Sequence, residues 1–321
     1  MCKHACGRIL DMKIVFMGTP EIAAMVLKSL IDSRHQVAAV VTQPDRPNKR
    51  GNEISYTPVK GIALENSIEV LQPEKASDPA FVEKLEKIAP DAIVVVAFGQ
   101  ILRKNVLELP KYGCINVHGS LLPKYRGAAP IQWAVINGDS ETGVTIMHMD
   151  AGIDTGDIIL QEKIALEPDE TAGSLFDKMG ALSGPVLLRA LDEIEAGKAV
   201  RVKQGEEGAS YVGILKKNMG RLSFHHGAKE LERLIRGLIP WPGAYTYVNG
   251  KMLKLWKTCI SGEEENVSAE PGQIRIVDNA FFIGTEDKPL QVLELQMEGK
   301  KRMAASDFIR GAAIADGSYT E

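Results

Sequence analysis

Short apolar runs alternate with amphipathic stretches along the first two hundred residues. The runs have the length and β-branched content of buried strands, and the stretches between them have helical spacing. Strands are expected at 13–18, 36–42, near 70, 91–98, 114–117, 143–149 and 158–164, and helices at 20–32, 59–66, 79–88, 129–137 and 171–196. This alternation predicts a doubly wound, mostly parallel α/β sheet, with ligands bound outside the carboxyl ends of its strands.

The junction between the first strand and the first helix carries a capping pattern. Gly18 allows a tight turn, Thr19 is a favourable N-cap, and Pro20 suits the first helical position. A strand, a glycine and a helix in this order also open dinucleotide-binding folds. The Gly-x-Gly-x-x-Gly signature of those folds is absent, so an NAD site is disfavoured.

The pattern of hydrophobic positions changes after Gly197. A short helix is expected at 228–236 and a turn at 240–243. Five β-type segments follow, at 244–248, 252–256, 272–277, 280–284 and 290–296. Short strands separated by turns predict a small β-barrel, of which the OB-fold is one candidate. The predicted organisation is a catalytic domain at 12–200, a linker at 201–220 and an OB-like domain at 221–321.

The composition is that of a soluble protein, and 321 residues are enough for two domains. The longest apolar run, Ala92–Phe98, is too short to span a bilayer, so no membrane association is expected. No disulfide framework is evident, which fits a reducing cytoplasm. The four cysteines are Cys2, Cys6, Cys114 and Cys259. A zinc site at Cys2, His4 and Cys6 is disfavoured because no second Cys/His pair follows at zinc spacing, and no metal is expected.

Positive charge is concentrated in one part of an acidic chain. The net charge is −4, which argues against broad, non-specific binding of nucleic acid. Residues 201–257, however, hold 11 Lys and Arg against 4 Asp and Glu. This stretch is either a solvated surface or a patch that faces phosphates. A polar, proline-broken loop after the second strand adds Arg46, Lys49 and Arg50.

The densest group of candidate catalytic residues lies between positions 116 and 157. Asn116, His118 and Asp154 stand in turn-rich segments next to apolar strands, where catalytic groups commonly lie. Asn116 and His118 share one face of an extended segment because side chains alternate along it. No nucleophile elbow and no metal-ligand spacing accompanies them. Each residue taken alone is also compatible with a turn or cap role.

Together the three groups suit polarisation of a carbonyl and transfer of protons. An amide N–H from Asn116 and a protonated His118 aimed at one carbonyl oxygen would stabilise a developing oxyanion. Asp154 would hold the imidazole protonated and oriented, or accept a proton from an attacking amine. Acyl transfer of this kind has no enzyme nucleophile, so the acceptor must bring its own.

Several longer motifs resemble the folate-dependent formyltransferases. They are NVHGSLLP at 116–123, RGAAP at 126–130, GVTIM at 143–147, DAGIDTGD at 150–157, KIVFMGTPE at 13–21, TQPDRP at 42–47 and PWP at 240–242. The resemblance covers nearly the whole chain. It is strongest to the branch of that family that formylates the methionine carried by initiator tRNA.

This resemblance implies a Rossmann-like catalytic domain in which Asn116, His118 and Asp154 are the catalytic trio. The donor would be 10-formyltetrahydrofolate, and the acceptor the α-amino group of methionine on initiator Met-tRNA. The implied folate contacts are Phe98, Gly99, Ser120, Leu121, Leu122 and Pro123. The implied tRNA contacts are Arg46, Lys49 and Arg50, together with the C-terminal domain. A monomer is implied as well.

Three alternatives stay open on the sequence alone: a formyltransferase for an amino sugar or glycinamide nucleotide, a 10-formyltetrahydrofolate hydrolase, and an RNA-binding module without activity. The chain also departs from the family pattern at two places. The loop at 48–55 has fewer glycines and lysines, and Ser223–Phe224 stand where an acidic or amide residue and a tryptophan are expected. His225 and His226 are expected on the surface.

Overall fold

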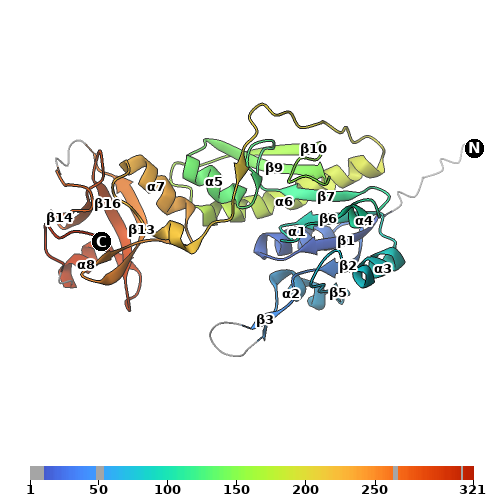
Figure 1. Cartoon of the computed structure of the whole chain (residues 1–321), viewed down its shortest axis with the longest axis horizontal. Coiled ribbons are helices and arrows are strands. Elements are labelled where there is room, and N and C mark those ends of the chain that lie inside the picture. The colour runs from blue at the N-terminus through green and yellow to red at the C-terminus, as the bar shows by residue number, and fades with distance from the viewer. Residues whose placement is uncertain (1–10, 48–53, 263–266, 312–313) are drawn as a thin grey trace, which may run out of the picture. The chain divides into compact units, whose positions relative to one another are not determined.

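The computed structural model describes residues 11–47, 54–262, 267–311 and 314–321 (Figure 1). Lys49 and Arg50 lie outside the described residues. The chain divides into two compact units. The N-terminal unit comprises the chain up to residue 127 together with 143–163 and 177–211, and the C-terminal unit comprises 128–142, 164–176 and 212–321.

A seven-stranded sheet forms the centre of the N-terminal unit (Figure 1). In sheet order its strands are β10 Ile158–Ala165, β9 Glu141–His148, β7 Cys114–His118, β6 Ala92–Val96, β1 Lys13–Gly18, β2 Gln36–Val41 and β5 Val70–Leu71. The five strands from β7 to β5 run parallel, and β7 pairs antiparallel with β9. The predicted mostly parallel sheet is therefore confirmed.

Helices cover both faces of this sheet. They are α1 Glu21–Ile31, α2 Pro58–Glu65, α3 Pro79–Ile88, α4 Lys104–Leu107 and α6 Ala172–Glu195. Val15 and Met17 share a buried cluster with Phe81 and Leu85 of α3, so they face that helix. Ile14 and Phe16 alternate with them and are fully buried against the opposite layer. No helix in the described ranges is both long and apolar enough to cross a bilayer.

The first helix begins one residue later than its capping pattern predicts. Pro20 occupies the N-cap position, and its carbonyl accepts hydrogen bonds from Ala23 and Ala24. The Thr19 hydroxyl instead donates to the carbonyl of Phe98 at 3.2 Å. The expectation that Thr19 caps the helix is wrong, because its side chain links the ends of β1 and β6.

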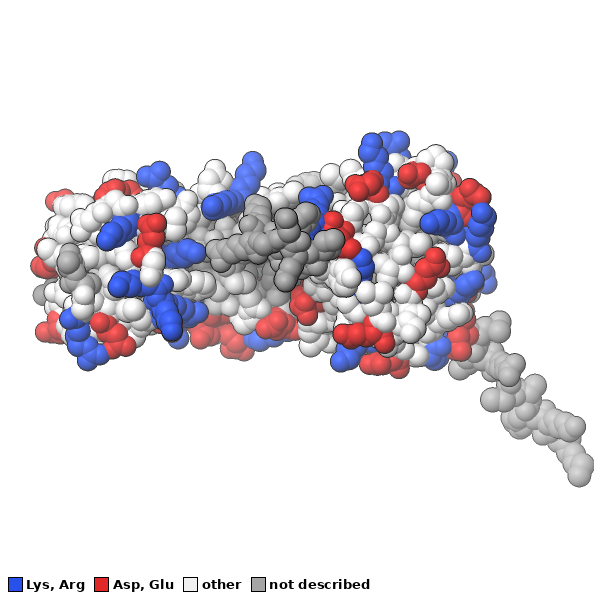
Figure 2. All heavy atoms as spheres, turned by 90° about the horizontal axis from the view of Figure 1, so that it is seen from below, with Lys and Arg blue, Asp and Glu red and all other residues white. Residues whose placement is uncertain are grey.

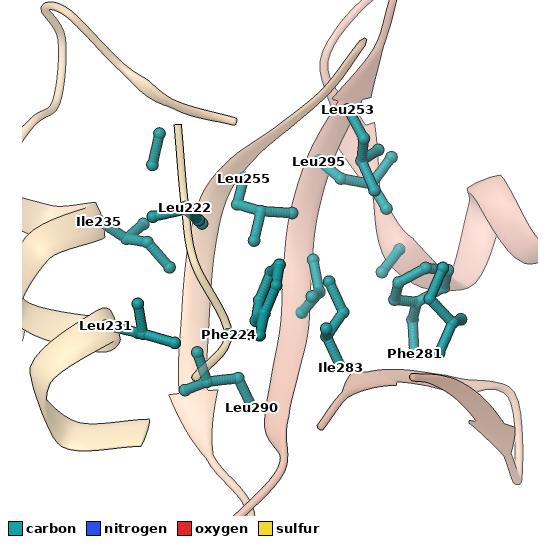
Figure 3. Close-up of a cluster of buried hydrophobic side chains, with 14 of the residues drawn as sticks. Leu222, Phe224, Leu231, Ile235, Leu253, Leu255, Phe281, Ile283, Leu290 and Leu295 are labelled. Carbon is teal, nitrogen blue, oxygen red and sulfur yellow. The ribbon is translucent and has the colours of Figure 1, made fainter. Parts of the chain in front are cut away.

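An antiparallel sheet organises the C-terminal unit, as predicted. In sheet order its strands are β12 Ala244–Val248, β13 Lys251–Ile260, β16 Leu290–Met297, β15 Ala280–Ile283 and β14 Ile274–Val277, with β17 Met303–Ala304 paired to β16. Three helices accompany it: α5 Pro130–Asn137, α7 Ala228–Gly237 and α8 Ala305–Gly311. Figure 3 shows the core between this sheet, α7 and α8, with Leu231 and Ile235 of α7 pointing toward the strands.

The last residues of the chain hydrogen-bond to both outer strands of this sheet. The backbone of Gly317 and Ser318 exchanges hydrogen bonds with Ile274, at the start of β14. The backbone N–H of Glu321 donates to the carbonyl of Tyr247, on β12, at 2.8 Å. Residues 317–321 therefore form a seam that covers backbone groups on both sheet edges, which would otherwise be free to pair with other chains.

Short elements complete the described chain. They are the hairpin β3 Arg46–Pro47 with β4 Ile54–Ser55, the pair β8 Arg126–Gly127 with β11 Tyr211–Val212, and the 3₁₀ helix η1 Lys217–Gly220. The segment predicted as a linker is not detached from the N-terminal unit. Val202 pairs with Ile158, and Ser210 accepts a backbone hydrogen bond from Arg126 at 2.8 Å.

The stability of the N-terminal unit is expected to fall as the pH drops from about 6.5 to 4. Burial and, to a smaller extent, the charge of Arg201 lower the pKa of His148 to about 4, while Asp157 opposes the shift. The unfolded chain binds this proton below pH 6.5 and the folded chain does not, so protonation favours unfolding over that range. Urea denaturation at pH 7.5, 6.0 and 5.0 measures the effect.

A His148→Gln variant isolates this histidine from other acid-sensitive groups. Its free energy of unfolding should depend less steeply on pH than that of the unchanged protein between pH 6.5 and 4. Parallel curves for the two proteins would show that His148 does not contribute.

Candidate active site

Two of the predicted catalytic residues lie on strand β7. Asn116 and His118 are both buried, with 8% and 6% of their surface exposed. They alternate with Val117 and so project from one face of the strand. β7 runs parallel to β6, with Asn116 beside Val95, which places both polar residues at the carboxyl end of the sheet. This is the edge where α/β sheets bind ligands.

The structure brings Asp154 to the same two side chains. Asn116 Nδ2 donates to Asp154 Oδ1 at 3.3 Å. His118 Nδ1 lies 3.7 Å from Asp154 Oδ2, which is an ion-pair distance but too long for a hydrogen bond. The backbone N–H of Gly127 donates to Asp154 Oδ2 at 2.8 Å. One carboxylate therefore joins the amide and the imidazole, as their sequence context predicts.

The two nitrogens of His118 have different surroundings. Nε2 lies 3.0 Å from the carbonyl oxygen of Tyr125. A carbonyl only accepts hydrogen bonds, so Nε2 carries a hydrogen in this arrangement. Nδ1 is the nitrogen that faces Asp154. A second proton on the ring would therefore sit on Nδ1, beside the carboxylate.

Asp154 belongs to a tightly constrained loop between β9 and β10. Its backbone is left-handed, with φ of +52°, a conformation that aspartate tolerates better than most residues. Asp150 fastens the loop by accepting hydrogen bonds from Thr155 Oγ1 and from the N–H of Gly152. At Gly156 a β-carbon would lie only 1.7 Å from the carbonyl oxygen of His148, so glycine is required there.

Two residues that support this loop were not expected from the sequence. Gln204, in the segment predicted as a linker, donates from Nε2 to the carbonyls of Asp154 and Gly156, each at 2.8 Å. Arg126 has only 1% of its surface exposed and donates from Nε to Gln204 Oε1 at 3.0 Å. Arg126 lies within the RGAAP motif at 126–130, so the sequence contained a pattern that could have identified it. No local pattern distinguishes Gln204 from the other polar residues around it.

The loop that follows β7 uses its own polar groups to hold its shape. Ser120 is fully buried, and its hydroxyl donates to the carbonyl of Lys124 at 2.6 Å. Thr145 Oγ1 donates to the carbonyl of Ser120, and Gln161 Nε2 donates to the carbonyl of Leu122. The Ser120 hydroxyl is thus engaged within the loop. The side chain of Leu122 is buried, whereas Leu121 and Pro123 are part-exposed.

A pocket of about 490 Å³ opens at the carboxyl ends of β1, β2 and β6. Phe98 and Gly99, predicted to bind the folate, line it together with Arg46. The Phe98 side chain is buried, and its carbonyl accepts hydrogen bonds from Thr19 and from Gln43 Nε2. The remaining lining residues are Thr19, Pro20, Gln43, Pro44, Tyr56, Thr57 and Ala97. Asn116 and His118, on the adjacent β7, do not line this pocket.

The start of the basic loop is anchored beside this pocket. Asp45 pairs with Lys60 of α2, and Gln72 Nε2 donates to Asp45 Oδ1 at 3.0 Å. The hydrogen bond from Lys60 lowers the pKa of the Asp45 carboxyl. Next to this anchor, Arg46 is exposed on β3. Arg46 is thus presented to solvent next to a fixed point of the fold.

Lys and Arg side chains gather over the middle of one face of the C-terminal unit in Figure 2, and Asp and Glu lie mostly toward its margins. Residues 251–257 carry three lysines of the basic stretch on β13. Phe224 is buried in the core of this unit, whereas His225 and His226 are exposed, as expected. Within the described ranges, no three His, Cys, Asp or Glu side chains are grouped as metal ligands would be.

Comparisons with known proteins show the family to which the chain is similar. Residues 12–191 match the family described as "Formyl transferase", and residues 214–313 match "Formyl transferase, C-terminal domain". The chain is 50% identical over 310 residues to a methionyl-tRNA formyltransferase of Lachnospira eligens, covering 95% of this chain and 98% of the relative. It is 49% identical over 310 residues to a methionyl-tRNA formyltransferase of Agathobacter rectalis, covering 96% and 99%.

Solved structures show the same fold. WlaRD, a sugar 3N-formyl transferase determined in the presence of dTDP and 5-N-formyl-THF, superposes with a TM-score of 0.65 at 21% identity, covering 91% of this chain and all of that one. The family matches span both units of the chain, and the relatives are similar over nearly their full length. The chain belongs to the formyltransferase family.

Proposed function

We propose that this protein transfers the formyl group of 10-formyltetrahydrofolate to the α-amino group of methionine on initiator tRNA. The observation that carries the proposal is the joining of Asn116, His118 and Asp154 at the carboxyl edge of the sheet. The identity of the acceptor is supported by the sequence comparisons. About half of the aligned residues are identical to those of methionyl-tRNA formyltransferases, over at least 95% of this chain. The product is N-formylmethionyl-tRNA for translation initiation, made in the cytoplasm by a monomer.

The reaction needs no nucleophile from the enzyme. A free α-amino group has a pKa near 8, so a neutral amine is available at working pH. Its lone pair attacks the formyl carbon, a C–N bond forms, and the carbonyl electrons move to the oxygen. Losing one preorganised donor to such an oxyanion costs roughly 2.7–4 kcal/mol of transition-state stabilisation.

The side chains supply two donors to that oxyanion. Asn116 has two N–H groups on Nδ2; one is used by Asp154, and the other is left for the substrate. His118 uses Nε2 on Tyr125, so Nδ1 is the atom that donates once the ring is protonated. The Asp154 carboxylate balances the imidazolium charge from 3.7 Å away.

Protons must also be moved for the intermediate to collapse. The attacking nitrogen loses a proton, for which Asp154 is the carboxylate in the trio. The bond from the formyl carbon to the folate nitrogen then breaks, and that nitrogen leaves with the electron pair and takes up a proton through water. Phe98, Gly99 and the 120–123 loop hold the folate, with Leu121 and Pro123 as its side-chain contacts.

Each part of the chain has its own proposed role in this reaction. Residues 12–200 form the catalytic domain, 201–220 the linker and 221–321 the OB-like domain that binds the tRNA backbone. Arg46, Lys49 and Arg50 are the residues proposed to contact the tRNA acceptor stem. Support comes from the exposure of Arg46 beside the 490 Å³ pocket and from the lysines on β13.

An acceptor-competition assay tests the proposed function. Purified protein and 10-formyltetrahydrofolate are mixed with initiator Met-tRNA, glycinamide ribonucleotide, a nucleotide-linked amino sugar or buffer alone. Formylmethionine on the tRNA is the expected product. Formylation of only a nucleotide or sugar, or release of formate in buffer alone at an equal rate, would overturn the proposed acceptor.

Replacing Arg46 by alanine should weaken binding of Met-tRNA and make it less sensitive to salt. A Lys or Arg that contacts a phosphate releases counterions, and each lost contact reduces the slope of log K against log salt by about 0.7–0.9. Filter binding from 50 to 200 mM salt measures the slope. Arg189→Ala, which removes an exposed arginine of α6, is the matched control. Equal slopes for Arg46→Ala and the unchanged protein would remove Arg46 from the tRNA interface.

A further inference from the structure

Asp154 is held through its main chain as well as its carboxylate. Its left-handed backbone is a conformation that non-glycine residues seldom adopt, so its neighbours must maintain it. Asp150, Thr155 and Gly152 fasten the earlier part of the loop to itself. Neither of those hydrogen bonds reaches the Asp154 carbonyl. That carbonyl accepts a hydrogen bond from Gln204.

Both ends of the Gln204 side-chain amide form hydrogen bonds. Nε2 donates at 2.8 Å to each of the carbonyls on either side of Thr155, those of Asp154 and Gly156. The other end of the amide, Oε1, accepts from Arg126 Nε at 3.0 Å. Only an amide supplies two donors at one end and an acceptor at the other in this geometry.

Arg126 fixes Gln204 in turn. Its guanidinium is buried and also donates to Tyr211, Glu206 and the carbonyl of Gly205, all in the same segment as Gln204. The next residue after Arg126 is Gly127, whose N–H donates to the Asp154 carboxylate. Arg126, Gln204, Asp154 and Gly127 thus close a ring of hydrogen bonds around the catalytic carboxylate.

We infer that Gln204 is a positioning residue for formyl transfer, which it serves by fixing the backbone of Asp154 through two donated hydrogen bonds. This inference rests on the proposed function for the role of Asp154. It assigns the first part of the predicted linker to the catalytic machinery. Gln204 acts through Asp154 and needs no contact with either substrate. A displacement of about 1 Å in a catalytic group is enough to lower the rate roughly 100-fold.

Two isosteric substitutions separate the contributions of this side chain. Gln204→Glu keeps an acceptor for Arg126 and replaces the two donors by an oxygen that faces two carbonyls. Gln204→Met keeps the length and removes every polar atom. Both variants should lower kcat at least tenfold, while the KM values for folate and Met-tRNA change less than threefold. Glu207→Gln, an exposed change of charge three residues away, is the matched control and should leave kcat unchanged.

A merely structural role would give a different pattern. It would lower the melting temperature and the folate affinity along with kcat, so thermal unfolding and binding of tetrahydrofolate are measured on all three variants. A kcat within twofold of the unchanged protein in both Gln204 variants would overturn the inference. So would a loss of kcat that is matched by the loss of folate binding.

A crystal structure of the Gln204→Glu variant tests the inference independently of the acceptor. The expected result is a displaced Asp154 whose carboxylate no longer accepts from Asn116. An Asp154 in its original position would overturn the inference even if the protein formylates Met-tRNA. A protein that does not formylate Met-tRNA would refute the proposed function, while a displaced Asp154 would still support the positioning role of Gln204.

Discussion

A His118→Ala variant is expected to lose roughly 10²–10⁴-fold in the rate of formyl transfer and to bind tetrahydrofolate within about twofold of the unchanged protein. The substitution removes the imidazole whose Nδ1 lies beside Asp154, and with it one proposed oxyanion donor. Single-turnover formation of formylmethionyl-tRNA at saturating donor measures the chemical step separately from product release.

The exposed His225 provides the control for this experiment. His225→Ala should retain the full single-turnover rate at saturating Met-tRNA, because the side chain is exposed and is not one of the candidate catalytic residues. A near-normal rate for His118→Ala would refute a catalytic role for that imidazole. A rate loss accompanied by an equal loss of folate binding would point to a disturbed pocket instead.

Gly156→Ala is expected to reduce kcat at least tenfold through displacement of the Asp154 loop. The added β-carbon would lie 1.7 Å from the carbonyl oxygen of His148 and 3.3 Å from the N–H nitrogen of Asp150. Both are backbone atoms, so a change of side-chain rotamer cannot relieve the clash. Strain of this kind typically costs about 1–3 kcal/mol. Steady-state kinetics and thermal unfolding measure the two consequences.

Gly61 offers a matched glycine without such a neighbour. It lies within α2, and no atom comes within 4 Å of the β-carbon that alanine would add. Gly61→Ala should leave kcat unchanged and raise the stability by about 0.5–1 kcal/mol, because alanine favours a helix. Equal kcat values for Gly156→Ala and Gly61→Ala would show that the loop tolerates the added carbon.

Most strands of the central sheet could be predicted because they contain a local run of apolar residues. Ala92–Val96, for example, is apolar and buried at every position, so hydrophobicity alone marks it. The two-residue strand β17 and the helix α8 had no such pattern and were not predicted. Their pairing and burial depend on β16 and the core of the C-terminal unit, which no local window contains.

The three members of the candidate trio could be named from the sequence. Asn116 and His118 lie at the end of one apolar strand, and Asp154 lies in a motif shared with a known family. Gln204 could not, because its role depends on a loop 48 residues away that only the fold brings near. For Ser120, by contrast, the motif predicts a contact that its hydrogen bond in the folded loop does not indicate. Its place in the motif suggested a ligand contact, whereas the folded loop buries its hydroxyl on the carbonyl of Lys124.

The seam of residues 317–321 is synthesised after both of the strands that it covers. These residues come after every strand they bind, and they pair with β12 and β14, which lie some 40 to 75 positions earlier. During synthesis on the ribosome, both outer strands are therefore made before the segment that covers them. Until residues 317–321 are made, the backbone groups of β12 and β14 that they bind are open edges of the kind that pair with other chains.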